Sequence, residues 1–295
     1  MLRDKLRGTG VALITPFKET GDLDFDALGR VIDYVIRDGA TYLVSLGTTG
    51  EAPTLSREER IDILNFTFER VNGLVPVVVG IGGNNTLELV KEMETLPLEN
   101  AFAILSASPY YNKPSQEGLY RHYKMLAEAT PKPILLYNVP GRTGRNIDAE
   151  TVIRLSNEVD NICGIKEASG NMAQCMQILR HKPADFLVVS GDDELVLPQI
   201  ACGMEGIISV VANCFPKAMC EMVQQCLKGD FKTAKHLNDQ LMEAYEFLFG
   251  ENNPAGVKAV MAEMGLIENS LRLPLVPLSS EWHAKVKQYF STEQV

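Results

Sequence analysis

Short apolar runs alternate along most of the chain with segments in which apolar residues recur every three or four positions. Short continuous apolar runs between Gly, Pro and Asn residues are typical of strands that are buried on both faces. The sequence therefore predicts eight such strands. They fall at residues 10–17, 42–47, 76–82, 101–111, 133–140, 162–169, 186–193 and 206–213.

The segments between these runs have the pattern of amphipathic helices. Ser56 and Glu59 have the spacing of a capping box, which predicts a helix start, and Asn72-Gly73 predicts its end. Pro216 suits the first turn of another helix. One predicted helix carries its apolar stripe at Leu28, Val31, Ile32, Val35 and Ile36.

Eight strands alternating with helices predict an α/β fold with a parallel sheet closed into a (β/α)₈ barrel. We place this TIM barrel at residues 1–228. A small C-terminal helical part follows at residues 229–295, with helical patterns near 237–248, 254–265 and 279–290. The alternative is an open, doubly wound sheet, which usually has fewer strands and a glycine fingerprint for a dinucleotide. "GIGGNN" matches that fingerprint only weakly.

Composition and charge narrow the function classes. The chain has 295 residues and a formal net charge of −10, which argues against a nucleic-acid partner or an anionic membrane surface. No apolar run has the length of a membrane span, and the first residues lack the apolar core of a signal peptide. Six scattered cysteines without a CxxC pair suit a reducing compartment, so we expect a cytoplasmic protein.

Catalytic residues of a (β/α)₈ barrel lie at the carboxyl ends of the strands. The sixth run, "ICGIKEASG", carries Lys166 near its end, where an apolar residue would be expected. One interpretation is a structural lysine paired with a carboxylate. The other is a Schiff-base lysine, because burial lowers the pKa of an amine and the neutral amine attacks carbonyl carbons.

Other strand ends supply residues that an imine mechanism needs. Tyr137 could move protons, or it could simply pack with a hydrogen bond. Thr48 and Thr49 lie in a glycine-flanked turn that could hold a carboxylate or only connect two elements. Arg142 lies in a Gly-Arg-Thr-Gly loop, either exposed to solvent or bound to a carboxylate through two parallel hydrogen bonds.

Other catalytic arrangements lack support in the sequence. The four histidines are far apart, and the sequence contains neither a zinc-type spacing nor a GxSxG turn for a nucleophilic serine.

Four motifs, in their order and spacing, resemble the dihydrodipicolinate synthases. They are "GTTGEAPTLSREER", "SPYYNKPSQEGLY", "YNVPGRTG" and "GIKEASG". This family belongs to the pyruvate-dependent class I aldolase superfamily, which includes N-acetylneuraminate lyase. The resemblance covers essentially the whole chain and implies a homotetrameric enzyme, a dimer of dimers, that needs no metal and no organic cofactor.

The resemblance also implies roles for individual residues. Lys166 would form the Schiff base with pyruvate. Tyr137 would be the acid and base, with Thr48 and Tyr111 completing a proton relay and Tyr111 reaching in from a neighbouring subunit. Substrate-binding residues would be Thr49 for the pyruvate carboxylate, Arg142 for the carboxylate of L-aspartate 4-semialdehyde, and Gly191 and Ile208 in the pocket wall.

The implied reaction joins pyruvate to L-aspartate 4-semialdehyde and yields 4-hydroxy-tetrahydrodipicolinate, the first committed intermediate of the diaminopimelate route to lysine. Arg142 favours this synthase over a sialic-acid lyase, because those lyases lack the Gly-Arg-Thr loop. A lyase for a sugar acid and a catalytically silent relative remain the alternatives. A silent relative would not need the whole set of implied catalytic residues.

Many bacterial members of the family bind L-lysine at a dimer interface and are inhibited by it. Positions matching that site persist at Asn84, Glu88 and Tyr110. Arg57 and Arg60 stand where lysine-sensitive relatives often carry histidines, and they either repel a cationic ligand or pair with Glu58 or Glu59. We expect weak or absent inhibition by lysine.

Overall fold

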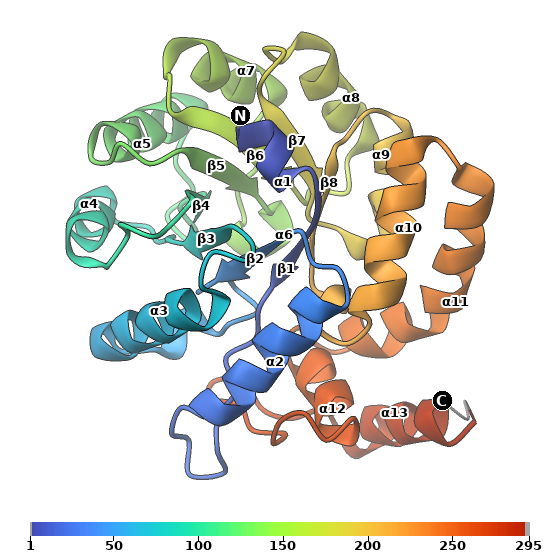
Figure 1. Cartoon of the computed structure of the whole chain (residues 1–295). Helices are drawn as coiled ribbons and strands as arrows, with labels where there is room; N and C mark the ends of the chain where they lie inside the picture. The colour runs from blue at the N-terminus through green and yellow to red at the C-terminus, as the bar shows by residue number, and fades with distance from the viewer. Residues whose placement is uncertain (1, 293–295) are drawn as a thin grey trace.

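Eight parallel strands close into a barrel in the computed structural model, which describes residues 2–292 (Figure 1). Each strand pairs with its neighbours in chain order, and β8 pairs with β1. The predicted (β/α)₈ barrel is confirmed, and the alternative of an open sheet is wrong. The strands are β1 (Gly8–Ala12), β2 (Tyr42–Ser45), β3 (Val77–Gly80), β4 (Ala103–Ala107), β5 (Ile134–Asn138), β6 (Ile162–Glu167), β7 (Leu187–Ser190) and β8 (Gly206–Ser209).

Every predicted apolar run overlaps a strand, but the strands are shorter than the runs. Leu13 and Ile14 follow β1 and are as buried as the strand itself. A residue in a buried loop satisfies the same apolar pattern as a residue in the sheet, so the pattern overestimates strand length. β1 begins at Gly8, two residues before the run.

The barrel interior has its own apolar core. Tyr42, Val44, Leu135 and Ile208 belong to it, and Leu6 of the short helix α1 (Leu2–Leu6) joins the same cluster. In Figure 1, α1 lies over the barrel opening. Helix α1 therefore plugs the amino end of the barrel and leaves only the carboxyl end open for a site.

The surrounding helices bury one face against the strands, and their ends follow the predicted signals. Ser56 and Glu59 form the capping box of α3 (Arg57–Val71), and Asn72 ends that helix in a left-handed conformation. Pro216 opens α10 (Pro216–Lys228). The remaining barrel helices are α2 (Phe25–Arg37), α4 (Thr86–Thr95), α5 (Gln116–Glu128), α6 (Pro140–Thr143), α7 (Ala149–Glu158), α8 (Met172–His181) and α9 (Val196–Ala201), with short 3₁₀ turns η1 (Ala52–Thr54), η2 (Asp193–Leu195) and η3 (Val211–Asn213).

Three helices form the C-terminal part: α11 (Phe231–Phe249), α12 (Ala255–Glu263) and α13 (Ser280–Thr292). Helix α11 packs along α10, and α12 contacts α11, α13 and η3 (Figure 1). We propose that the boundary with the barrel falls after Lys228, where Gly229 ends α10 in a left-handed conformation.

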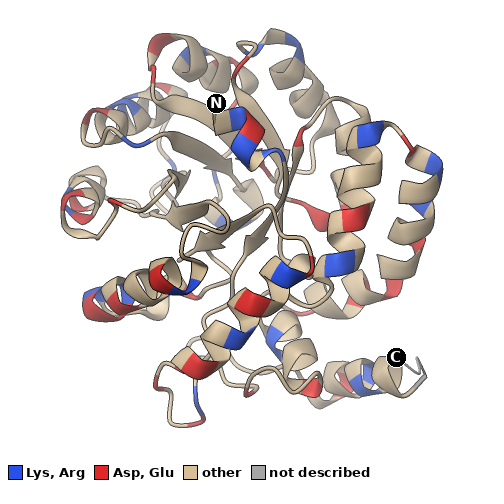
Figure 2. Cartoon of the chain, in the orientation of Figure 1, with Lys and Arg blue, Asp and Glu red and all other residues tan. Residues whose placement is uncertain are grey.

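Charged residues of both signs are spread over the outer helices, and few lie on the strands (Figure 2). Within the described part of the chain, no helix combines the length and apolar character that crossing a membrane requires.

Candidate active site

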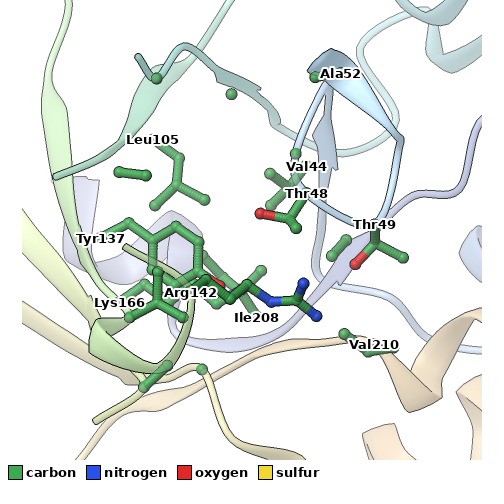
Figure 3. A pocket seen from close by; sticks show the side chains of 18 of the residues that line it. Val44, Thr48, Thr49, Ala52, Leu105, Tyr137, Arg142, Lys166, Ile208 and Val210 are labelled. Atoms are coloured by element: carbon green, nitrogen blue, oxygen red, sulfur yellow. The ribbon is translucent and has the colours of Figure 1, made fainter. Parts of the chain in front are cut away.

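A cavity of about 630 Å³ opens at the carboxyl ends of the strands. Every strand or the loop that follows it contributes to the wall. Of the eight residues predicted to be catalytic or substrate-binding, seven line this cavity: Thr48, Thr49, Tyr137, Arg142, Lys166, Gly191 and Ile208. Figure 3 shows Tyr137, Lys166, Arg142 and Ile208 grouped on one side, with Thr48 and Thr49 on the other.

Lys166 lies inside the barrel because of the strand alternation on β6. Its neighbour Glu167 points outward and is held by Asn138 and Gln174, so Lys166 points inward. Lys166 is 4% exposed, and its Nζ lies 4.4 Å from the centroid of the Tyr137 ring. The strand register pairs these two residues across β5 and β6.

No ion pair joins Lys166 to a carboxylate among residues 2–292. The interpretation of Lys166 as a structural lysine within an ion pair therefore finds no support in the structure. A buried amine beside an aromatic ring, at the bottom of an open cavity, has the placement that an imine-forming lysine requires.

The turn after β2 presents the two threonines to the cavity. Thr49 is buried and its Oγ1 accepts a hydrogen bond from Nδ2 of Asn253 at 3.0 Å. Thr48 is half-buried. The hydroxyl of Thr15 donates to the carbonyl of Gly50 at 2.7 Å and fixes the end of the turn. Hydroxyls and backbone amides in such a turn can receive a carboxylate.

Arg142 lies in the one-turn helix α6, not in the loop that the sequence predicted. Pro140 starts this helix, and Gly144 ends it with φ of 70°. The exposed Arg142 guanidinium reaches over the cavity, where Nη2 donates to the carbonyl of Asn253 at 3.4 Å. An exposed arginine at the cavity mouth can bind the carboxylate of an incoming substrate through two parallel hydrogen bonds.

Sequence reasoning missed Asn253, which contacts both Thr49 and Arg142. The signal in the sequence was the Asn-Pro step before a helical pattern, and that step indicates only a helix start. Asn253 comes 204 residues after Thr49. Only the packing of α12 against the barrel brings the two together.

Asp193, at the end of the seventh predicted strand, also lines the cavity. It is buried and accepts hydrogen bonds from Ser209 Oγ at 2.5 Å and from the Val210 amide at 3.1 Å. Burial raises the pKa of Asp193 to about 6, against the opposite effects of these hydrogen bonds and of the Lys166 charge. The carboxylate ties the end of β7 to the end of β8 and so fixes Ile208. Within the described residues, no three His, Cys, Asp or Glu side chains form a group that could hold a metal ion.

Tyr111 does not line the cavity of its own chain. Its side chain is 87% exposed, and its φ of 70° is unusual for a residue with a side chain. Tyr110, its neighbour, does line the cavity. The structure of a single chain thus leaves the predicted proton relay without Tyr111.

The residues predicted to form an allosteric lysine site are brought together only in part. Asn84 Nδ2 donates to the carbonyl of Tyr110 at 3.3 Å, whereas Glu88 forms an exposed ion pair with Lys91. Arg60 pairs with Glu92 at 2.5 Å and also donates to the Ala52 carbonyl. Of the two alternatives for Arg60, a pairing with Glu58 or Glu59 is not found, because Arg60 pairs with Glu92 and Glu59 pairs with Arg272.

Comparisons with known proteins show the family of this chain. The sequence profile of the dihydrodipicolinate synthetase family matches residues 5–293. A protein of Parabacteroides distasonis named 4-hydroxy-tetrahydrodipicolinate synthase is 49% identical over 283 residues, covering 96% of this chain and 95% of that one. A protein of Phocaeicola vulgatus with the same name is 50% identical over 277 residues, covering 94% and 93%.

Solved structures of dihydrodipicolinate synthases superpose closely on this chain. The crystal structure of dihydrodipicolinate synthase from Thermotoga maritima superposes with a TM-score of 0.94 at 40% identity, covering 97% of this chain and 98% of that one. The enzyme from Cyanidioschyzon merolae with lysine bound superposes with a TM-score of 0.92 at 33% identity, covering 95% and 96%. The chain belongs to the dihydrodipicolinate synthetase family.

Proposed function

We propose that this chain condenses pyruvate with L-aspartate 4-semialdehyde through a Schiff base on Lys166 and forms 4-hydroxy-tetrahydrodipicolinate. The observation that carries this proposal is the buried Lys166 amine beside the Tyr137 ring at the bottom of the cavity. The product would be the first committed intermediate of lysine biosynthesis through diaminopimelate.

The amine of Lys166 adds to the C2 carbonyl carbon of pyruvate and expels water to form an imine. Once protonated, the imine withdraws electrons, so a C3 proton is lost and an enamine forms. The enamine carbon bonds to the aldehyde carbon of the second substrate, whose oxygen becomes a hydroxyl. The amino group of that substrate then attacks C2 and displaces Lys166, which closes the ring. Tyr137, next to the amine, would transfer the protons.

The two carboxylates would bind on different sides of the cavity. Thr49, with the turn around Thr48, would hold the carboxylate of pyruvate close to Lys166. Arg142, at the mouth, would hold the carboxylate of L-aspartate 4-semialdehyde, because the guanidinium matches a carboxylate in two parallel hydrogen bonds. Gly191 and Ile208 would shape the wall beside the imine.

We further propose a homotetramer, a dimer of dimers, in which Tyr111 of one subunit completes the proton relay of its neighbour. The nearly full exposure of Tyr111 in the single chain supports a role outside that chain. We also propose a cytoplasmic location, supported by six free cysteine thiols. Sedimentation of the purified protein at four times the 32.6 kDa chain mass is the expected result, and a monomer would contradict it.

Sodium borohydride trapping tests the chemistry directly. With pyruvate present, intact-protein mass should increase by one reduced pyruvate adduct per chain, and peptide mapping should place it on Lys166. The Lys166→Met variant should not be labelled, whereas Lys182→Met, a partly buried lysine paired with Glu205, should be labelled normally. Absence of an adduct on folded protein would overturn the mechanism. Cleavage of a sugar acid without condensation would identify the chain as a lyase.

A further inference from the structure

The turn that carries Thr48 and Thr49 ends in a buried carboxylate for which the proposed reaction has no use. Glu51 follows Gly50 and adopts a left-handed backbone with φ of 53° and ψ of 32°. Its Oε1 lies 2.5 Å from Nζ of Lys258, and both side chains are fully buried. A buried ion pair is costly to form, and removal of one partner leaves a buried charge uncompensated. The free-energy cost of burying both charges must therefore be offset by what the pair does at this position.

Lys258 belongs to α12, in the C-terminal helical part. Its Nζ also donates to the carbonyl of Ser270 at 2.9 Å and lies 4.2 Å from the centroid of the Phe17 ring. The second carboxylate oxygen of Glu51 accepts a hydrogen bond from the backbone amide of Arg272 at 3.1 Å. Glu51 is thus held twice by the C-terminal part.

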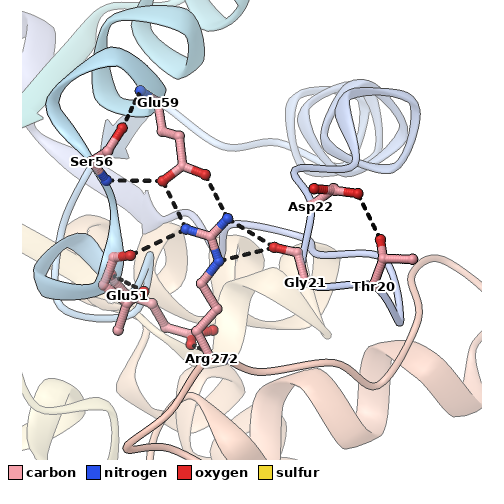
Figure 4. A network of polar contacts seen from close by, with 8 residues as sticks. Thr20, Gly21, Asp22, Glu51, Ser56, Glu59 and Arg272 are labelled. Carbon is pink, nitrogen blue, oxygen red and sulfur yellow. Dashed lines mark hydrogen bonds and ion pairs between the residues drawn. The ribbon is translucent and has the colours of Figure 1, made fainter.

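The side chain of Arg272 strengthens this connection (Figure 4). Its guanidinium pairs with both oxygens of Glu59, at 2.5 and 2.7 Å, and donates to the carbonyls of Gly21 and Thr54. One side chain therefore joins the loop after β1, the segment after the threonine turn and the C-terminal part.

The backbone of the turn needs such support. Leu46 and Glu51, which flank it, both have positive φ, and residues other than glycine adopt this conformation only when their surroundings enforce it. Asn253, four residues after α11, provides a second anchor through Oγ1 of Thr49. The C-terminal part thus binds the turn at Thr49 and at Glu51, on both sides of Gly50.

Resting on the proposed function, we propose that Glu51 and Lys258 are positioning residues that hold the Thr48–Thr49 turn in the geometry that binds the carboxylate of pyruvate. The C-terminal helical part then acts as a clamp on the active site, in addition to covering one side of the barrel. Neither residue lines the cavity, so their effect must pass through the turn.

The electrostatics of the pair indicate what its removal should change. Burial lowers the pKa of Lys258 to about 8, with the Glu51 charge acting in the opposite direction. Both charges lose hydration on burial, so we expect the pair to add little net stability. Removing both charges together should therefore loosen the turn without unfolding the protein.

The experiment compares Lys258→Met with the double variant Glu51→Gln/Lys258→Met, which carries no unpaired charge. In both, we expect the KM for pyruvate to rise about tenfold or more, because small displacements of positioning groups have large effects. Amide hydrogen exchange should become faster in the peptide spanning residues 46–55, a readout that does not depend on activity. Lys285→Met breaks an exposed ion pair with Glu246 in the same C-terminal part and should change neither quantity.

Folded variants with the KM and the exchange rate of the parent protein would overturn the proposal. If neither variant folds, the pair supports the whole fold, and its assignment to the turn is wrong. The variants could show faster exchange in residues 46–55 while the parent protein forms no pyruvate adduct. That result would support the role of the pair in holding the turn and would refute the proposed function.

Discussion

Gly191 lies directly against the side chain of Lys166. A methyl group placed on its Cα would sit 2.7 Å from Cε of Lys166, closer than side-chain carbons approach in folded proteins, and 3.0 Å from Cγ, which is a tight contact. The glycine after β7 thus creates the channel through which the lysine stem reaches the cavity.

Gly191→Ala should therefore displace the Lys166 amine. We expect kcat/KM to fall by at least about tenfold, which corresponds to about 1.4 kcal/mol in the transition-state free energy, with the fold retained. Steady-state kinetics and circular dichroism measure the two effects. The control is Gly29→Ala in α2, where the added methyl would meet Phe66 at an ordinary 3.4 Å. Full activity of Gly191→Ala would show that the lysine stem can shift without consequence.

Arg142→Lys should separate the two substrates. The lysine keeps the positive charge but loses the paired hydrogen bonds, so we expect the KM for L-aspartate 4-semialdehyde to rise by about ten- to a hundredfold. The KM for pyruvate and the borohydride adduct should stay unchanged, since neither involves Arg142. Arg121→Lys, at an exposed pair on α5, is the matched control. An equal rise in both KM values would contradict the assignment of Arg142 to the second substrate.

L-Lysine at millimolar concentration should inhibit the enzyme weakly or not at all. Arg60 of α3 binds Glu92 of α4 and the Ala52 carbonyl, so its guanidinium occupies space beside the cavity. Glu88 already forms an ion pair with Lys91. A cationic ligand would meet Arg60 and a carboxylate that already has a partner. Initial rates over a range of L-lysine concentrations measure this. Strong inhibition in the low millimolar range would refute the prediction.

His122 should make the fold sensitive to acid. Burial lowers the pKa of His122 from 6.5 to about 4, and its Nδ1 lies 2.8 Å from Oγ1 of Thr86. The unfolded chain therefore binds a proton between pH 6.5 and 4 while the native chain does not. This contribution lowers the free energy of unfolding by up to about 3 kcal/mol as the pH falls through that window.

The comparison of parent protein with His122→Gln in urea, at pH 7 and at pH 4.5, measures that contribution. At pH 7 the imidazole is mostly neutral in both states, so the difference in stability between the two proteins at that pH serves as the baseline. The parent protein should lose more stability than the variant on acidification. Parallel loss in both proteins would assign the acid sensitivity to other groups.

Local signals in the sequence were sufficient for the elements and for the central residues of the site. Apolar runs separated by amphipathic segments predicted all eight strands, and the capping box at Ser56 predicted the start of α3. Lys166 was recognisable because a lysine among buried apolar residues departs from the pattern around it. These features depend on neighbours within a few positions, which is the range over which hydrophobic periodicity and helix capping act.

Tertiary structure alone decided which distant residues complete the site. Asn253 and Lys258 reach the turn after β2 across more than 200 positions of the chain, because α12 packs beside the closed barrel. Tyr111 is exposed and does not line the cavity of its own chain. Arg60 pairs with Glu92 and not with Glu58 or Glu59, which are closer in the sequence. A side chain pairs with whichever group the packed fold brings within reach, and no local pattern records that choice.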